Sequence, residues 1–145
     1  MSKKVLIVDD EEMMRKFLSI QLLKWEYEVK EAIDGIHALE RLAEEDFNLI
    51  ICDIVMPHMN GWQLLGKIRE NPKTKDVPVI VLTAKDEDSD MSKGYELGAS
   101  YYITKPFSSV ELLQGIQMIS EEGVSESRNR LEIFQEYNDS EQQTS

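Results

Sequence analysis

A short apolar run that ends in one carboxylate constrains the fold of this chain more than any other feature. Residues 48–53 read Asn-Leu-Ile-Ile-Cys-Asp, and a Pro and a Gly follow within eight residues, which forces a loop. Such a run suits a strand that is buried on both faces of a parallel sheet. A carboxylate at the end of a buried strand is costly unless something pairs with it. On position alone, Asp53 either orders the loop and caps the next helix, or is the centre of a site.

Four further strand-like segments alternate with segments whose apolar residues recur at helical spacing. The predicted strands cover residues 3–8, 27–32, 48–53, 77–82 and 100–104. The predicted helices cover residues 14–25, 36–45, 61–71, 90–97 and 108–119. In the first helix, Met14, Phe17 or Leu18, Gln21 or Leu22, and Trp25 recur at helical spacing and should face the core. The fourth helix should be the least stable element. The alternation predicts an α/β fold, a doubly wound parallel sheet with helices on both faces.

Length, charge and cysteine content restrict the class of protein. With 145 residues the chain is long enough for one domain with a core of its own. It has no apolar run near the ~18 residues that a membrane span needs, and its N-terminus lacks the pattern of a signal peptide. The single cysteine, Cys52, lies in an apolar run, which suits a reducing cytoplasm. The net charge of −12 argues against direct binding to nucleic acid and fits metal cations or basic protein surfaces.

The character of the sequence changes at Gly123. Residues 124–145 contain five acidic residues and two arginines, which gives a net charge of −3. Leu131 and Phe134 are among the few apolar residues there, and the last residues are polar. We therefore expect a folded domain over residues 1–122 and an acidic polar tail or linker, partly disordered, over residues 123–145.

Polar side chains stand at the carboxyl ends of four of the five predicted strands. Asp9 and Asp10 follow the first strand, Asp53 ends the third, Thr83 follows the fourth and Lys105 follows the fifth. In a doubly wound sheet these ends share one edge, so the five side chains should converge. Three carboxylates in one pocket repel one another unless a divalent cation lies among them, and oxygen ligands favour Mg²⁺. A lysine and a hydroxyl beside them suit a phosphoryl group, so the pattern indicates phosphoryl transfer onto Asp53.

Four motifs at these strand ends carry a resemblance to a known family. They are Val-Asp9-Asp10-Glu, Cys-Asp53-Ile-Val-Met-Pro57-His-Met-Asn-Gly61, Val-Leu-Thr83-Ala84 and Tyr102-Ile-Thr-Lys105-Pro106-Phe107. Together they resemble the response-regulator receiver domain of two-component signalling, which has the fold of the chemotaxis regulators. The resemblance covers residues 1 to about 121. It implies a flavodoxin-like (βα)5 three-layer sandwich with parallel strands in the order 2-1-3-4-5.

The resemblance also implies a chemical role for each residue of the pattern. Asp53 would accept a phosphoryl group from the phosphohistidine of a sensor histidine kinase or a phosphotransfer protein. The ligands of Mg²⁺ would be Asp9, Asp10, Asp53 and the backbone carbonyl of Val55. Lys105 and Thr83 would contact the phosphoryl oxygens. The Lys105–Pro106 peptide would be cis, which proline makes affordable.

The same resemblance implies a switch that transmits the signal. Thr83 would move toward the phosphoryl group and Tyr102 would swing inward, which would remodel the surface of the fourth helix, fifth strand and fifth helix. That surface would bind a downstream protein effector, act on a fused output domain, or form a dimer. The chain would catalyse only its own phosphorylation and dephosphorylation and would otherwise not be an enzyme.

The sequence argues against two rival functions, because each needs residues that this chain lacks at one place. Two alternatives stay open. A phosphatase of the haloacid-dehalogenase type needs a second acid two residues after the acceptor, where this chain has Val55. A flavodoxin-like cofactor binder needs a hydroxyl- and glycine-rich loop after the first strand, where this chain has Asp9-Asp10-Glu-Glu. The chain could still be the N-terminal receiver of a larger regulator or hybrid kinase. It could also be a pseudo-receiver that is not phosphorylated and only docks proteins.

Overall fold

The computed structural model describes residues 3–84 and 98–120 of the chain. The chain divides between Pro106 and Phe107 into two compact units. The helix expected over residues 90–97 and the tail expected over residues 123–145 lie outside the described residues. The boundary expected at residue 122 therefore stays a prediction.

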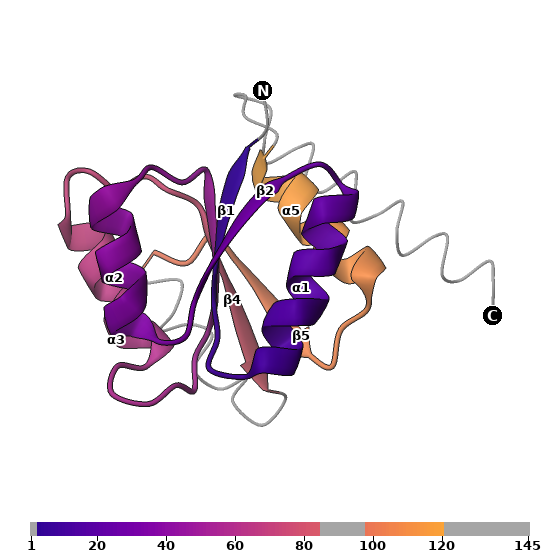
Figure 1. Cartoon of the computed structure of the whole chain (residues 1–145), viewed down its shortest axis with the longest axis horizontal. Helices are drawn as coiled ribbons and strands as arrows, with labels where there is room; N and C mark the ends of the chain where they lie inside the picture. The colour runs from indigo at the N-terminus through magenta and orange to yellow at the C-terminus, as the bar shows by residue number, and fades with distance from the viewer. Residues whose placement is uncertain (1–2, 85–97, 121–145) are drawn as a thin grey trace. The chain divides into compact units, whose positions relative to one another are not determined.

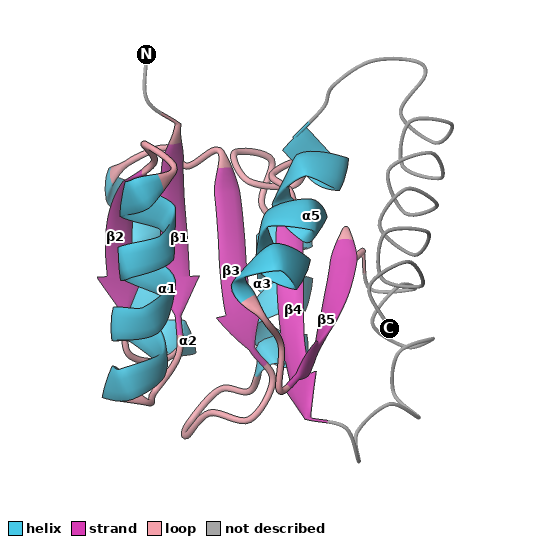
Figure 2. Cartoon of the chain, turned by 90° about the vertical axis from the view of Figure 1, so that its right-hand side faces the viewer, coloured by secondary structure: helices cyan, strands magenta, loops and turns pink. Residues whose placement is uncertain are grey.

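Five parallel strands form one sheet in the described part of the first unit. They are β1 (Lys4–Val8), β2 (Glu28–Ala32), β3 (Leu49–Asp53), β4 (Val79–Ala84) and β5 (Tyr101–Lys105). Their order across the sheet is β2-β1-β3-β4-β5, and Figure 2 shows them side by side in this order. The arrangement confirms the predicted doubly wound α/β fold and the strand order that the resemblance implies.

Helices cover both faces of the sheet in the first unit. In Figure 1, α1 (Glu12–Lys24) lies on one face, while α2 (Gly35–Glu44) and α3 (Gly61–Glu70) lie on the other. In the second unit, α5 (Ser109–Ser120) begins after Ser108, whose Oγ accepts a hydrogen bond from the Glu111 N–H at 3.2 Å. Ser108 and Glu111 have the spacing of a capping box, of which this bond is one half. No helix within residues 3–84 and 98–120 is long and apolar enough to cross a membrane.

The sheet is apolar and buried at its centre and charged at its β2 edge. Every residue of β3 is buried, as are the first five residues of β4. This burial on both faces matches the prediction made from the unbroken apolar run before Asp53. The edge strand β2 carries Glu28, Lys30 and Glu31, which are exposed or half-buried. Charged side chains on an edge strand discourage pairing with another chain.

The buried stripe of α1 is narrower than the sequence predicts. Leu18 and Leu22 are fully buried, in agreement with their helical spacing. Met14, Phe17 and Trp25 are only half-buried, so the predicted core stripe is correct for the alternatives Leu18 and Leu22 and wrong in extent for the other three residues. Large aromatic side chains rarely bury completely, and Trp25 stands at the C-terminal cap of the helix. The two leucines therefore anchor α1 to the sheet, and the larger side chains border the contact.

The start of α3 lies directly against the end of β3. The Gly61 N–H donates a hydrogen bond to the Ile54 carbonyl at 2.8 Å. A Cβ atom at Gly61 would lie 2.5 Å from the Asp53 carbonyl oxygen and 2.8 Å from Ile54 Cα. Asn60 and Gln63 cap the helix reciprocally, each side chain accepting a hydrogen bond from the backbone N–H of the other. The missing side chain at Gly61 thus lets the loop after Asp53 close tightly onto β3.

We expect Gly61→Ala to destabilise the protein by roughly 1–3 kcal/mol, because its Cβ would overlap backbone atoms rather than a flexible side chain. Gly66→Ala is the matched control, since nothing lies within 4 Å of a Cβ at that position of α3. The control should gain about 0.5–1 kcal/mol from better helix propensity. Urea unfolding of both variants and wild type measures the two changes. Equal changes in both variants would refute the close approach at Gly61.

Candidate functional site

The sheet brings three carboxylates together at the carboxyl ends of β1 and β3. Val8 pairs with Cys52 in register, so Asp9, which directly follows β1, and Asp53, the last residue of β3, are neighbours. One carboxylate oxygen from each of Asp9, Asp10 and Asp53 lies within 4.8 Å of the other two. Asp9 is 0% exposed and Asp53 is 6% exposed, whereas Asp10 faces solvent. The structure therefore places together the three acids that the sequence indicates as metal ligands.

Lys105, at the end of β5, reaches the two buried acids. Its Nζ donates a hydrogen bond to Asp53 Oδ2 at 2.9 Å and lies 4.0 Å from Asp9 Oδ2. The other Asp53 oxygen, Oδ1, accepts a hydrogen bond from the Ile54 N–H at 2.8 Å. Both oxygens of Asp53 thus accept a hydrogen bond. One of the two donors, Lys105, is a cation that could also bond to a negatively charged group attached to Asp53.

One of the two carboxylate oxygens of Asp9 accepts no hydrogen bond from the described residues. Its N–H donates to the Ala32 carbonyl at 3.1 Å, and its carbonyl accepts from Arg15 Nη1 at 2.9 Å. Its Oδ1 accepts from the Glu11 N–H at 2.8 Å, whereas its Oδ2 is buried and accepts no hydrogen bond from the described residues. A buried carboxylate oxygen without a donor favours a cation, and a set of oxygen ligands alone suits a hard ion. The residues present therefore fit Mg²⁺.

Burial and charge shift the pKa values of two groups in the site. Burial, with a smaller contribution from the charge of Asp53, raises the pKa of Asp9 to about 6 from an ordinary 3.8. The hydrogen bond from Glu11 and the charge of Lys105 oppose that rise. Burial lowers the pKa of Lys105, but the hydrogen bond and charge of Asp53 outweigh it and raise this pKa above 10.5. Lys105 therefore stays cationic at neutral pH, and Asp9 titrates just below neutrality.

Thr83 and Tyr102 lie on the two strands beyond β3. Asp53 pairs with Leu82 in register, so Thr83 stands one residue past Asp53 on the neighbouring strand. Thr83 is fully buried, and Tyr102 is 7% exposed. The Tyr102 ring lies 5.9 Å from the ring of Trp62 on α3, with the two planes tilted by 51°. Tyr102 therefore already occupies an inward position in this structure.

Two residues of the site are clearer in the structure than in the sequence. Arg15 on α1 bonds to the Asp9 carbonyl through Nη1 and to Glu31 Oε1 through Nε at 3.1 Å. Reasoning from sequence missed it, because a bond to a backbone carbonyl leaves no side-chain pattern in the sequence. Trp62, the residue after Gly61, packs on the core and on Tyr102.

Comparison with known proteins decides the family. A family model described as the response regulator receiver domain matches residues 5–117. The chain belongs to this family. The receiver domain is 39% identical over 119 residues to the transcriptional regulatory protein SrrA of Staphylococcus aureus, a match that covers 82% of this chain and 48% of SrrA. The chain thus spans about half the length of the curated relatives it matches.

Solved structures of other response regulators share the fold of this receiver domain. The chemotaxis response regulator CheY4 of Vibrio cholerae is 33% identical with a TM-score of 0.77, over 81% of this chain and 98% of CheY4. The response regulator TrrA of Thermotoga maritima, solved in complex with Mg²⁺ and BeF, is 34% identical with a TM-score of 0.70. That match covers 79% of this chain and 96% of TrrA. Receiver domains are signalling switches rather than enzymes in the ordinary sense.

Two further predicted features of the receiver domain follow the site residues in the chain. Val55 is the second residue after Asp53 and is 61% exposed. Its backbone carbonyl belongs to the loop that follows β3. The peptide bond between Lys105 and Pro106 is cis.

The pKa of Asp9 makes the stability of the metal-free receiver domain depend on pH. Its pKa is about 6 in the folded protein and 3.8 ordinarily, so the folded state binds the proton more tightly. The stability from this proton is present below the ordinary pKa and is lost as the pH rises through the folded value, roughly 1–3 kcal/mol in all. We expect Asp9→Asn, which keeps an oxygen for the Glu11 N–H, to be more stable than wild type at neutral pH.

Urea unfolding at neutral pH and near pH 4, in the presence of a chelator, measures this difference. The advantage of Asp9→Asn should become much smaller near pH 4, where Asp9 is protonated in the folded state and about half protonated in the unfolded state. A stability difference that does not change between the two pH values would contradict the raised pKa of Asp9.

Proposed function

We propose that this receiver domain is a phosphorylation-dependent signalling switch in which Asp53 accepts a phosphoryl group from a phosphohistidine. The observation that carries the proposal is the contact of 2.9 Å between Lys105 Nζ and Asp53 Oδ2, beside a buried Asp9 oxygen that has no donor. A carboxylate nucleophile with a cationic donor and a set of metal ligands at its side is what phosphoryl transfer onto an aspartate requires.

Asp53 supplies the nucleophile for the transfer. One of its oxygens attacks phosphorus, an O–P bond forms as the N–P bond of the phosphohistidine breaks, and the imidazole leaves with the electron pair of that bond. Lys105 Nζ moves from Asp53 Oδ2 to a phosphoryl oxygen, and Thr83 Oγ1 donates to another. The residues that would hold Mg²⁺ are Asp9, Asp10, Asp53 and the backbone carbonyl of Val55. When bound, the ion offsets negative charge on the phosphoryl oxygens.

The signal would pass from Asp53 to β5 through Thr83 and Tyr102. Phosphorylation replaces the single negative charge of the Asp53 carboxylate with the roughly 1.5 to 2 negative charges of the phosphoryl group, and it gives the Thr83 hydroxyl a strong acceptor. Thr83 is buried, so a displacement of its side chain changes the packing of the strand beside it. Tyr102 lies inward against Trp62, and phosphorylation would fix it there. The surface of the helix expected over residues 90–97, β5 and α5 would then change its binding properties.

The partners follow from this chemistry. A sensor histidine kinase or a phosphotransfer protein would supply the phosphoryl group, and the chain would catalyse only its own phosphorylation and dephosphorylation. The output would be a downstream protein effector, a fused output domain, or a dimer formed through the remodelled surface. The match to about half of SrrA fits a receiver within a larger regulator, and the match to 98% of CheY4 fits a receiver that acts alone, so both arrangements stay open. The net charge of −12 for the whole chain supports protein partners rather than nucleic acid, and the free, buried Cys52 supports a location in the cytoplasm.

A phosphodonor assay tests the proposal. With acetyl phosphate and Mg²⁺, wild type should gain the mass of one phosphoryl group, and with a chelator it should gain none. Asp53→Asn should gain none under either condition, because an amide is not a nucleophile for phosphorus. Intact-mass spectrometry measures the gain, and tryptophan fluorescence should change in parallel because Trp62 contacts Tyr102. If Trp62 is the tryptophan whose fluorescence changes, a Trp62→Phe variant should lose that change.

Absence of any mass gain in wild type would contradict the proposal and favour the pseudo-receiver that only docks proteins. A gain that persists in Asp53→Asn would place the acceptor elsewhere in the chain.

A further inference from the structure

We propose that Arg15 is a positioning residue that sets the direction of the Asp9 and Asp10 carboxylates toward Mg²⁺. The inference rests on the proposed function of the acidic site, because it concerns how that site binds its cation. Arg15 acts on the backbone between the two acids and would not itself be a ligand.

Arg15 extends from α1 back to the turn that carries both acids. Its Nη1 donates to the Asp9 carbonyl at 2.9 Å in a partly buried contact. Its Nε donates to Glu31 Oε1 at 3.1 Å in an exposed contact. The Arg15 side chain is only 15% exposed, and its backbone N–H bonds to the Glu11 carbonyl of the same turn. A guanidinium that uses two of its donors in fixed directions holds its partners more firmly than a single ammonium.

The Asp9 carbonyl belongs to the peptide group that joins Asp9 to Asp10. Because a peptide group is planar, a bond that fixes this carbonyl also fixes the Asp10 N–H and the direction in which Asp10 leaves the turn. The Asp9 N–H and Oδ1 are held by Ala32 and Glu11, so Arg15 restrains the part of Asp9 that those bonds leave open. Asp10 faces solvent, so its direction depends strongly on this peptide group.

Two other roles for Arg15 predict different results. As a positive charge near the acids, it would repel Mg²⁺, so its removal would strengthen Mg²⁺ binding. As a link from α1 to β2 through Glu31, it would affect folding stability alone, and only slightly because that ion pair is exposed. Only the positioning role predicts weaker Mg²⁺ binding when the side chain is removed.

Mg²⁺ titrations of the unphosphorylated protein, followed by tryptophan fluorescence or calorimetry, test the proposal. Arg15→Met should raise the Kd for Mg²⁺ about tenfold, the size expected for loss of a group that orients metal ligands. Arg15→Lys, which keeps the charge and one possible donor to Asp9, should raise it less. At saturating Mg²⁺ the phosphorylation rate of Arg15→Met should return close to that of wild type, because the acceptor and Lys105 are unchanged.

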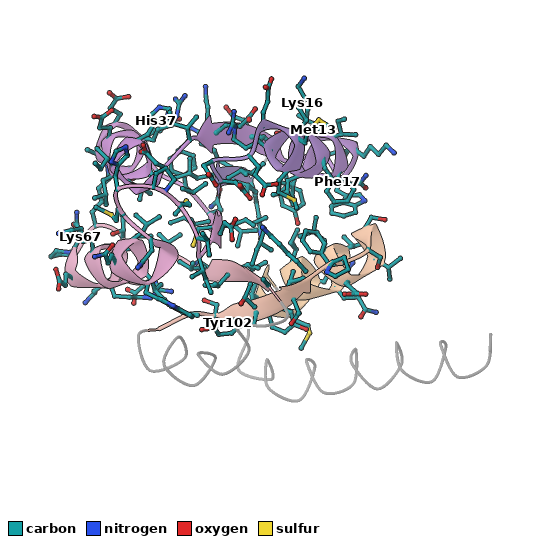
Figure 3. All side chains as sticks on the ribbon, turned by 90° about the horizontal axis from the view of Figure 1, so that it is seen from below. Met13, Lys16, Phe17, His37, Lys67 and Tyr102 are labelled. Atoms are coloured by element: carbon teal, nitrogen blue, oxygen red, sulfur yellow. The ribbon has the colours of Figure 1, made fainter. Side chains whose placement is uncertain are left out.

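Two variants serve as matched controls. Lys16→Met removes the same charge from the next residue of α1, whose side chain is 65% exposed, projects outward in Figure 3 and pairs with Glu12. Glu31→Ala removes the link to β2 and leaves the bond between Arg15 and Asp9 in place. The Kd for Mg²⁺ of each control should stay within about twofold of wild type, because exposed charges are strongly screened.

A Kd for Arg15→Met that equals or falls below that of wild type overturns the proposal, as does an equally large effect of Glu31→Ala. If circular dichroism shows that Arg15→Met does not fold, Arg15→Lys decides, and an unchanged Kd for it overturns the proposal. Failure of wild type to bind Mg²⁺ would overturn both this inference and the proposed function. Wild-type binding and phosphorylation with no effect of Arg15 substitution would overturn this inference alone.

Discussion

Repulsion between carboxylates is the constraint on which the rest of this receiver domain depends. Asp9, Asp10 and Asp53 converge to within 4.8 Å, and two of them are buried. In the described part of the chain, Lys105 is the cation that contacts both buried acids. One lysine does not balance three carboxylates, and burial, with a smaller contribution from the charge of Asp53, raises the pKa of Asp9. The apolar sheet supplies the folding free energy that holds the acids together, and a bound cation would offset their repulsion.

The strand register of the parallel sheet brings the acids close together. Val8 pairs with Cys52, and the residue that follows each of them is an aspartate. The neighbouring strand then adds Thr83 one residue past Asp53. The loop that leaves Asp53 is closed by Gly61, where a side chain would strike the β3 backbone. The site is therefore a direct consequence of strand register and of one close helix approach, rather than of long loops.

Most of the fold and the acidic site could be predicted from the sequence, because both depend on local patterns. Apolar runs that end in polar residues predicted the strands and the convergence of their ends, whereas the strand order came from the family resemblance. Features that depend on three-dimensional packing were harder to predict from the sequence. Trp25 is less buried than its helical spacing indicates, and the inward Tyr102 depends on its contact with Trp62, a residue distant in sequence. Arg15 was missed because its bond goes to a backbone carbonyl, which no side-chain pattern reports.

Thermal unfolding with and without Mg²⁺, at constant ionic strength, tests most directly whether a divalent cation balances the three carboxylates. A ligand that binds only the folded state at ten times its Kd adds about 1.4 kcal/mol of stability. For a domain of this size, that corresponds to a rise of roughly 3–8 °C in the unfolding midpoint. We expect such a rise for wild type and a smaller one for Asp53→Asn. An unchanged midpoint for wild type in saturating Mg²⁺ would contradict the central role of a cation at this site.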